Sequence, residues 1–154
     1  MIYQLHREQQ LNCDMDTAWK FFSNPYNLSR ITPKDMKFVV QTKMEDETIY
    51  EGMIIEYKVS PLFGIPMKWK SRITQVEYHK NFTDFQEAGP YKLWNHHHEF
   101  IPNQSGVLME DRLDYELPFG FIGTIVHALL AKNKLNKIFD YRYEVLEKMF
   151  NKKK

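Results

Sequence analysis

The polar–apolar pattern of this chain changes once, at Pro118-Phe119-Gly120, and this change limits the possible folds more than any other feature. Between residues 36 and 117, apolar and polar residues alternate and turn residues recur at regular intervals, which is typical of an antiparallel meander. After the change, nothing interrupts a helix from about Gly123 to Lys152, a length of roughly 40 Å at 1.5 Å per residue. The chain is therefore predicted to fold as a meander followed by one long helix.

Strands of the meander are expected over residues 36–43, 48–60, 66–79, 82–88, 92–101 and 107–117. A further strand is expected over residues 2–12, where polar and apolar residues mix without a helical period. Asp14 can cap a short helix that ends at Asn24-Pro25, and a second short helix follows from about Asn27 to Thr32-Pro33. These elements predict an α+β fold, in which a seven-stranded, curved antiparallel sheet closes over the long C-terminal helix. One helix cannot fill such a sheet unless the inner side chains are very large, and otherwise a cavity is left.

Length and charge exclude several classes of protein. With 154 residues, the chain is expected to form one domain over residues 1–154. Its net charge of +1 provides no long-range attraction for nucleic acid or anionic lipid, so neither is expected as a partner. The sequence has no run of about 18 consecutive apolar residues and no apolar leader, which predicts a cytoplasmic protein without stable membrane insertion. A single cysteine, Cys13, excludes an internal disulfide bond and fits a reducing compartment.

Aromatic residues make up 15% of the chain, and rings in that number either fill a large core or line a cavity. The most distinctive segment is Trp94-Asn95-His96-His97-His98-Glu99-Phe100. In a strand, alternate side chains share a face, so Trp94, His96, His98 and Phe100 point the same way. Their large rings identify that face as the inner one.

The following strand offers inward partners for these residues. If the hairpin loop within residues 102–106 contains no bulge, the pairs are His98 with Asp111, His96 with Leu113, and Trp94 with Tyr115. Two imidazoles and one carboxylate would then face an aromatic cavity.

Four interpretations of His96, His98 and Asp111 remain open. They can form a buried hydrogen-bonded group that only satisfies polar atoms in a core. They can hold the carbonyl or hydroxyl group of a ligand, or they can transfer protons, which makes them the candidate catalytic residues. They can also supply the three ligands of an open zinc site, although nothing else in the sequence supports one. No metal and no cofactor is expected, and the sequence has no phosphate-binding Gly-rich loop and no Gly-x-Ser-x-Gly elbow.

The long helix has two unusual features. Residues 121–131 are apolar on nearly all sides, so the first half is expected to be more deeply buried than the second, or to face an apolar surface that is not protein. Arg142 and Lys132 interrupt the apolar stripe, which costs free energy unless their charged ends reach water or a carboxylate. For Arg142 a structural ion pair is expected, for example with Asp84 or Glu87, and recognition of a ligand carboxylate is the alternative.

Residues along most of the chain match one superfamily. They are Asn27-Leu28, Ile31-Thr32-Pro33, Gly52, Tyr57, Gly64, Pro66, Trp69, Phe82, Asp84, Gly89-Pro90-Tyr91, Trp94, His96, His98, Phe100, Asp111, Tyr115, Leu117-Pro118-Phe119-Gly120, Phe139 and Tyr141-Arg142. Their order resembles the helix-grip fold of the START/SRPBCC superfamily, which includes birch-pollen-allergen-like proteins, polyketide cyclases and coenzyme Q-binding proteins. The local motifs resemble small bacterial SRPBCC proteins that are also found fused to sugar-epimerase-like domains.

The resemblance implies a ligand-binding module with an apolar cavity between the sheet and the long helix. In this fold, residues 62–67 and 119–123 would border the entrance, where we expect a mobile gate or alternatively an oligomer contact. The expected function is binding of a hydrophobic or amphipathic small molecule, such as a lipid, an isoprenoid quinone or an aromatic polyketide-like compound. The alternatives are a cyclase or dehydratase that uses the two histidines and Asp111, and a regulatory module whose partner is a protein with an oxidoreductase- or epimerase-like domain. The expected ligand-binding residues are Tyr57, Trp69, Ser71, Trp94, His96, His98, Phe100, Tyr115, Phe121, Ile125, Leu129 and Arg142.

Overall fold

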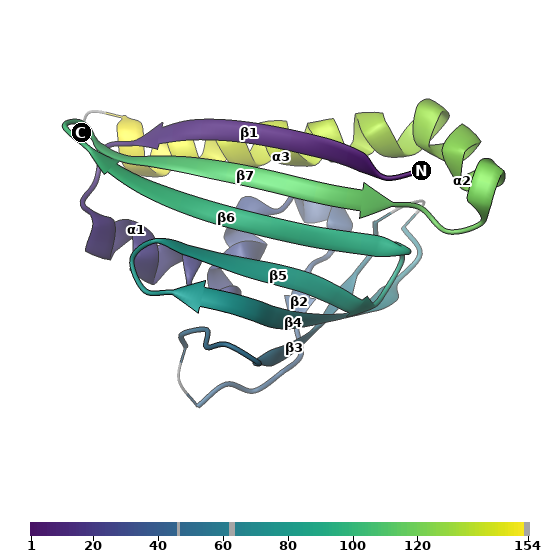
Figure 1. Ribbon diagram of the computed structural model, residues 1–154, viewed down its shortest axis with the longest axis horizontal. Coiled ribbons are helices and arrows are strands. Elements are labelled where there is room, and N and C mark those ends of the chain that lie inside the picture. Colours follow the sequence, from purple (N-terminus) through teal and green to yellow (C-terminus); the bar gives the residue numbers. More distant parts are fainter. Residues whose placement is uncertain (46, 62–63, 153–154) are drawn as a thin grey trace.

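The computed structural model describes residues 1–45, 47–61 and 64–152, and its main element is one antiparallel sheet of seven strands (Figure 1). The order across the sheet is β1-β7-β6-β5-β4-β3-β2, so every neighbouring pair except β1 and β7 is consecutive in the chain. The strands are β1 (Tyr3–Leu11), β2 (Val39–Val40), β3 (Ile54–Val59), β4 (Met67–Glu77), β5 (Asn81–Ala88), β6 (Leu93–Asn103) and β7 (Gly106–Glu116). The predicted seven-stranded sheet is confirmed.

Helices cover one face of this sheet, behind the strands in the view of Figure 1. After β1 come the helix α1 (Met15–Phe22) and two 3₁₀ turns, η1 (Pro25–Ile31) and η2 (Lys34–Met36). Asp14 caps α1 as predicted, because its carboxylate accepts a 2.7 Å hydrogen bond from the backbone N–H of Thr17. The C-terminal helix runs without a break through α2 (Gly120–Val126), the π-helical turn η3 (His127–Ala131), α3 (Lys132–Leu146) and a second π-helical turn, η4 (Glu147–Asn151).

Two predicted strands are much shorter than expected. Of residues 36–43 only Val39–Val40 form a strand, because the chain leaves η2 through Lys37, whose φ of 48° is left-handed. Of residues 48–60 only Ile54–Val59 do so. Ile49 and Met53 are nevertheless buried in the core, so the apolar alternation at these positions reflects burial in a loop rather than strand pairing.

The β6–β7 hairpin has the predicted register. His98 lies opposite Asp111, His96 opposite Leu113, and Trp94 opposite Tyr115. Gly106 closes the turn with a φ of +134°, and a Cβ atom there would lie 2.3 Å from the carbonyl oxygen of Leu11. Glycine is therefore required at the start of β7.

The core lies between the sheet and the helices. Trp19 of α1 makes edge-to-face contacts with Phe82 of β5 and Phe100 of β6, at centroid distances of 6.1 and 5.8 Å. At the other end, Leu135 and Phe139 of α3 pack against a cluster that includes Leu113 and Tyr115 of β7. Both helices thus cover the face to which the inner residues of β6 point.

The first half of the C-terminal helix is not the more buried half, so the first of the two alternatives for it is wrong. Phe121 is 77% exposed and Leu129 is 68% exposed, because α2 lies beyond the end of β7 (Figure 1). This half is anchored by His127, which stacks on Tyr3 at a centroid distance of 3.4 Å and forms a 2.6 Å hydrogen bond with the hydroxyl group of Tyr115. Within the described residues, no helix is long and apolar enough to cross a membrane.

Candidate functional site

A cavity of about 170 Å³ lies between the sheet, the short helices and α3. Most side chains around it are aromatic or aliphatic, as in ligand pockets generally. Of the twelve predicted ligand-binding residues, the structure brings together seven on the cavity wall: Tyr57, Trp69, Ser71, Trp94, His96, His98 and Arg142.

The other five predicted residues lie outside the cavity wall. Phe100 is buried in the core against Trp19, and Tyr115 is covered by His127. Phe121, Ile125 and Leu129 are exposed on the first half of the C-terminal helix, so they do not line this cavity. The sequence shows that these side chains are apolar, but it does not show that α2 extends past the end of the sheet.

The predicted gate segments are only partly described. Leu62 and Phe63 lie outside the described residues. Ile65 is 59% exposed and Phe119 is 79% exposed, and neither lines the cavity.

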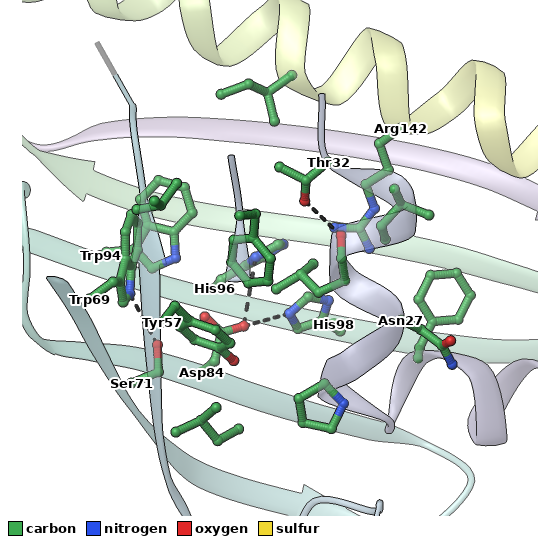
Figure 2. A pocket seen from close by; sticks show the side chains of 18 of the residues that line it. Asn27, Thr32, Tyr57, Trp69, Ser71, Asp84, Trp94, His96, His98 and Arg142 are labelled. Carbon is green, nitrogen blue, oxygen red and sulfur yellow. Dashed lines mark hydrogen bonds and ion pairs between the residues drawn. The ribbon is translucent and has the colours of Figure 1, made fainter. Parts of the chain in front are cut away.

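Three adjacent strands place four ionisable side chains on the same inner face. Asp84 of β5 lies opposite His96 of β6, and His98 of β6 lies opposite Asp111 of β7. Figure 2 shows Asp84, His96 and His98 pointing toward one another, with Trp69 and Trp94 together on one side. We call Asp84, His96, His98 and Asp111 the His–Asp cluster.

Each histidine of the cluster lies between the two carboxylates. His98 donates from Nε2 to Oδ2 of Asp84 at 2.7 Å, and its Nδ1 is 3.2 Å from Oδ1 of Asp111. His96 donates from Nε2 to Oδ1 of Asp111 at 2.9 Å, and its Nδ1 is 3.8 Å from Oδ2 of Asp84. The centroids of the two imidazole rings are 3.8 Å apart, so the rings lie next to each other.

Burial and pairing shift the pKa values of the two histidines in opposite directions. Burial and the charge of His98 lower the pKa of His96. Burial also acts to lower the pKa of His98, but its contacts with Asp111 and Asp84 outweigh this and raise it. Of the two histidines, His98 is therefore the one that is more readily protonated.

Both carboxylates of the cluster are held in the ionised form. Burial acts to raise the pKa of Asp111, but the charge of Arg142 and the hydrogen bonds from the histidines keep it well below its usual range. Burial also acts to raise the pKa of Asp84. The hydrogen bond from His98 and the charges of the two histidines outweigh burial, so the pKa of Asp84 is lowered. Two ionised carboxylates thus face the guanidinium of Arg142 and the two histidines, of which His98 is the more readily protonated.

Arg142 does form an ion pair, but with neither of the two partners suggested for it. Its Nη2 is 3.5 Å from Oδ1 of Asp111, while Glu87 pairs with Arg72 and with Lys70. Asp84 is instead held by His98 and His96, and Glu87 is exposed near the end of β5, whereas Arg142 is buried next to Asp111. The rings of Phe22 and Phe139 flank the guanidinium at 5.7 and 5.9 Å.

Sequence reasoning missed Asp84 as a member of the cluster. The signal was present in the alternation Phe82-x-Asp84-x-Gln86, because Phe82 identifies the inner face and Asp84 shares its parity. A metal site was considered with Asp111 as the third ligand. In the structure, ligand atoms of Asp84, His96 and His98 all lie within 4.8 Å of one another, so these three residues could hold a metal ion without Asp111. Among the described residues, His6, Glu8 and Glu110 form a second group with this spacing.

The fold is similar to that of several solved structures. A protein from Chromobacterium violaceum matches with a TM-score of 0.68 and 12% identity, over 97% of this chain and 99% of that chain. Major latex-like protein 151 from Panax ginseng matches with a TM-score of 0.68 and 15% identity, over 98% of this chain and 99% of that one. A Thermus thermophilus protein matches with a TM-score of 0.68 and 13% identity, over 94% and 97% of the two chains. This chain has the birch-pollen-allergen-like helix-grip fold.

Sequence comparison adds no family assignment. No protein-family model matches the chain, and no curated protein matches it by sequence. At identities of 12–15%, the structural likeness establishes the fold and not a function.

Proposed function

We propose that this protein binds a hydrophobic or amphipathic small molecule in the cavity between the sheet and α3. The cavity carries the proposal, because about 170 Å³ of apolar-lined space exceeds the ~150 Å³ cavity that is able to hold benzene. The rings of Trp69 and Trp94, 5.0 Å apart and perpendicular, offer two faces to an apolar ligand. The His–Asp cluster provides a polar end. Lipids, isoprenoid quinones and aromatic polyketide-like compounds are the ligand classes that combine these properties.

The test is titration with Prodan, a neutral two-ring dye whose emission depends on its environment. We expect saturable binding and a Tm that rises with dye concentration. Ile138→Trp, on the cavity wall, should weaken binding at least ten-fold because the new ring occupies the cavity. Ile122→Trp is the matched control, since Ile122 lies on the same long helix but is 52% exposed and away from the cavity. If Prodan and n-alkanols of several lengths all fail to bind the folded protein, the proposal is wrong.

A second candidate function is acid–base catalysis, as in a cyclase or dehydratase. The adjacent rings of His96 and His98, with centroids 3.8 Å apart, and the opposite shifts of their pKa values favour it, because a lowered pKa suits a general base and a raised pKa a general acid. In a dehydration, His96 would remove a carbon-bound proton and His98 would protonate the departing hydroxyl group.

Dehydration of 4-hydroxy-4-phenylbutan-2-one to its conjugated enone can be followed by absorbance. Acceleration should be lost in His96→Gln and in His98→Gln. It should persist in His97→Gln, because His97 faces the other side of β6 and contacts Thr83 and Glu99. Equal rates with and without the protein would argue against this function and leave ligand binding intact.

A further inference from the structure

Arg142 is a buried cation whose hydrogen-bonding groups are not satisfied. Arg142 is 7% exposed and lies on the cavity wall, where its side chain points from α3 toward the sheet (Figure 2). Nε has no hydrogen-bond partner among the described residues. The 3.5 Å contact between Nη2 and Asp111 is an ion pair longer than an ordinary hydrogen bond.

Asp111 cannot satisfy this guanidinium alone. Oδ1 of Asp111 already accepts from His96 at 2.9 Å and lies 3.2 Å from Nδ1 of His98. A guanidinium carries five N–H donors in a planar fork, and the flanking rings of Phe22 and Phe139 accept none of them as ordinary acceptors. Buried donors without acceptors are costly, so an acceptor supplied from the cavity would stabilise this arrangement.

We propose that Arg142 binds the carboxylate of a compact amphipathic acid, whose apolar part lies against Trp69 and Trp94. This inference rests on the proposed binding function and names the class of ligand. A carboxylate offers two oxygens in the spacing of the guanidinium fork, so it satisfies two donors at once, which a hydroxyl or carbonyl group does not. The cavity volume of about 170 Å³ favours a one- or two-ring aromatic acid or a short-chain acid.

Lys134 is the other cation of α3 on the cavity wall, and it is a poorer anchor. Its Nζ already pairs with a carboxylate, since Oδ2 of Asp35 lies 2.9 Å away. Lys134 therefore serves as the matched control for Arg142: it has the same charge, lies on the same helix and borders the same cavity.

The experiment compares 2-naphthoate with 2-naphthamide, which has the same shape and no charge, using quenching of tryptophan fluorescence. The unmodified protein should bind the acid at least ten-fold more tightly than the amide. Arg142→Gln should weaken binding of the acid at least ten-fold and change binding of the amide less than two-fold. Lys134→Gln should keep the preference for the acid.

A second variant covers the possibility that Arg142→Gln does not fold because Asp111 loses its partner. The double variant Asp111→Asn/Arg142→Gln removes one charge of each sign, and it should also lose the preference for the acid. Equal binding of acid and amide by the unmodified protein, with Prodan still bound, would overturn the carboxylate assignment and leave the proposed function standing. If acid, amide and Prodan all fail to bind, the proposed function is wrong and this inference is wrong with it.

Discussion

Asp111→Asn tests the energetic role of the His–Asp cluster most directly. Asp111 is 3% exposed, and its Oδ1 is contacted by His96, His98 and Arg142 at 2.9, 3.2 and 3.5 Å. Removing one partner of a buried ionic group costs roughly 3–5 kcal/mol, because the remaining charges are left unpaired. His98 can release its proton and reduce the excess positive charge, so we expect a loss at the lower end, about 3 kcal/mol in the free energy of unfolding.

Urea denaturation at pH 7 measures this loss, and Tm should fall by about 6–12 °C for a chain of this size. The folded-state pKa of Asp111 is lowered, so its contribution is present above the unfolded pKa of about 3.9 and is lost as pH falls through the folded value. The difference between the two proteins should therefore shrink in acid. Asp114→Asn is the control on the same strand. Asp114 accepts a 2.9 Å hydrogen bond from Gln4 on the outer side, and its loss should cost less than about 1 kcal/mol. A loss below about 1 kcal/mol for Asp111→Asn would refute the buried ionic arrangement.

Two further changes test neighbouring parts of the site. Trp94→Ala should cost about 3 kcal/mol in chemical denaturation, because Trp94 packs on Trp69 and Tyr91 at centroid distances of 5.0 and 4.8 Å; a loss below about 1 kcal/mol would mean that these contacts contribute little. His98→Gln should destabilise the protein more at pH 5 than at pH 9, since the raised pKa of His98 contributes stability that is complete below its unfolded pKa and is lost as pH rises through the folded value. Unfolding curves at both pH values check this, and an equal loss at both would show that His98 is not the charged member of the pair.

The hairpin of β6 and β7 could be predicted from sequence because two independent signals agree there. Alternation identified the inner face of Trp94–Phe100, and the turn residues fixed the pairing of His98 with Asp111. In residues 48–53, before β3, only the alternation of apolar and polar residues was present, without turn residues that fix a pairing. Ile49 and Met53 are spaced like inward strand residues, yet they are buried by a loop, since any short segment can turn apolar side chains inward without pairing.

The contacts of the long helix could not be predicted in the same way. A helical pattern gives the relative directions of its side chains, but not the point at which the helix crosses the sheet. That point depends on how far α2 extends past β7, and His127 sets it through contacts with Tyr3 and Tyr115 from two different strands. A shift along the helix axis of one turn, about 5.4 Å, would be enough to move Arg142 away from Asp111.

The same positioning explains why Arg142 belongs to the site rather than to the surface. With α3 where it is, the guanidinium lies beside Asp111 and balances one of the two carboxylates, and His98 balances the other when it is protonated. The balance is electrostatic only: the charge of Arg142 is matched by Asp111, while Nε is left without an acceptor among the described residues. A buried guanidinium with an unsatisfied donor favours a ligand with strong acceptors. A carboxylate would add one negative charge, and that charge would favour protonation of the histidines of the cluster.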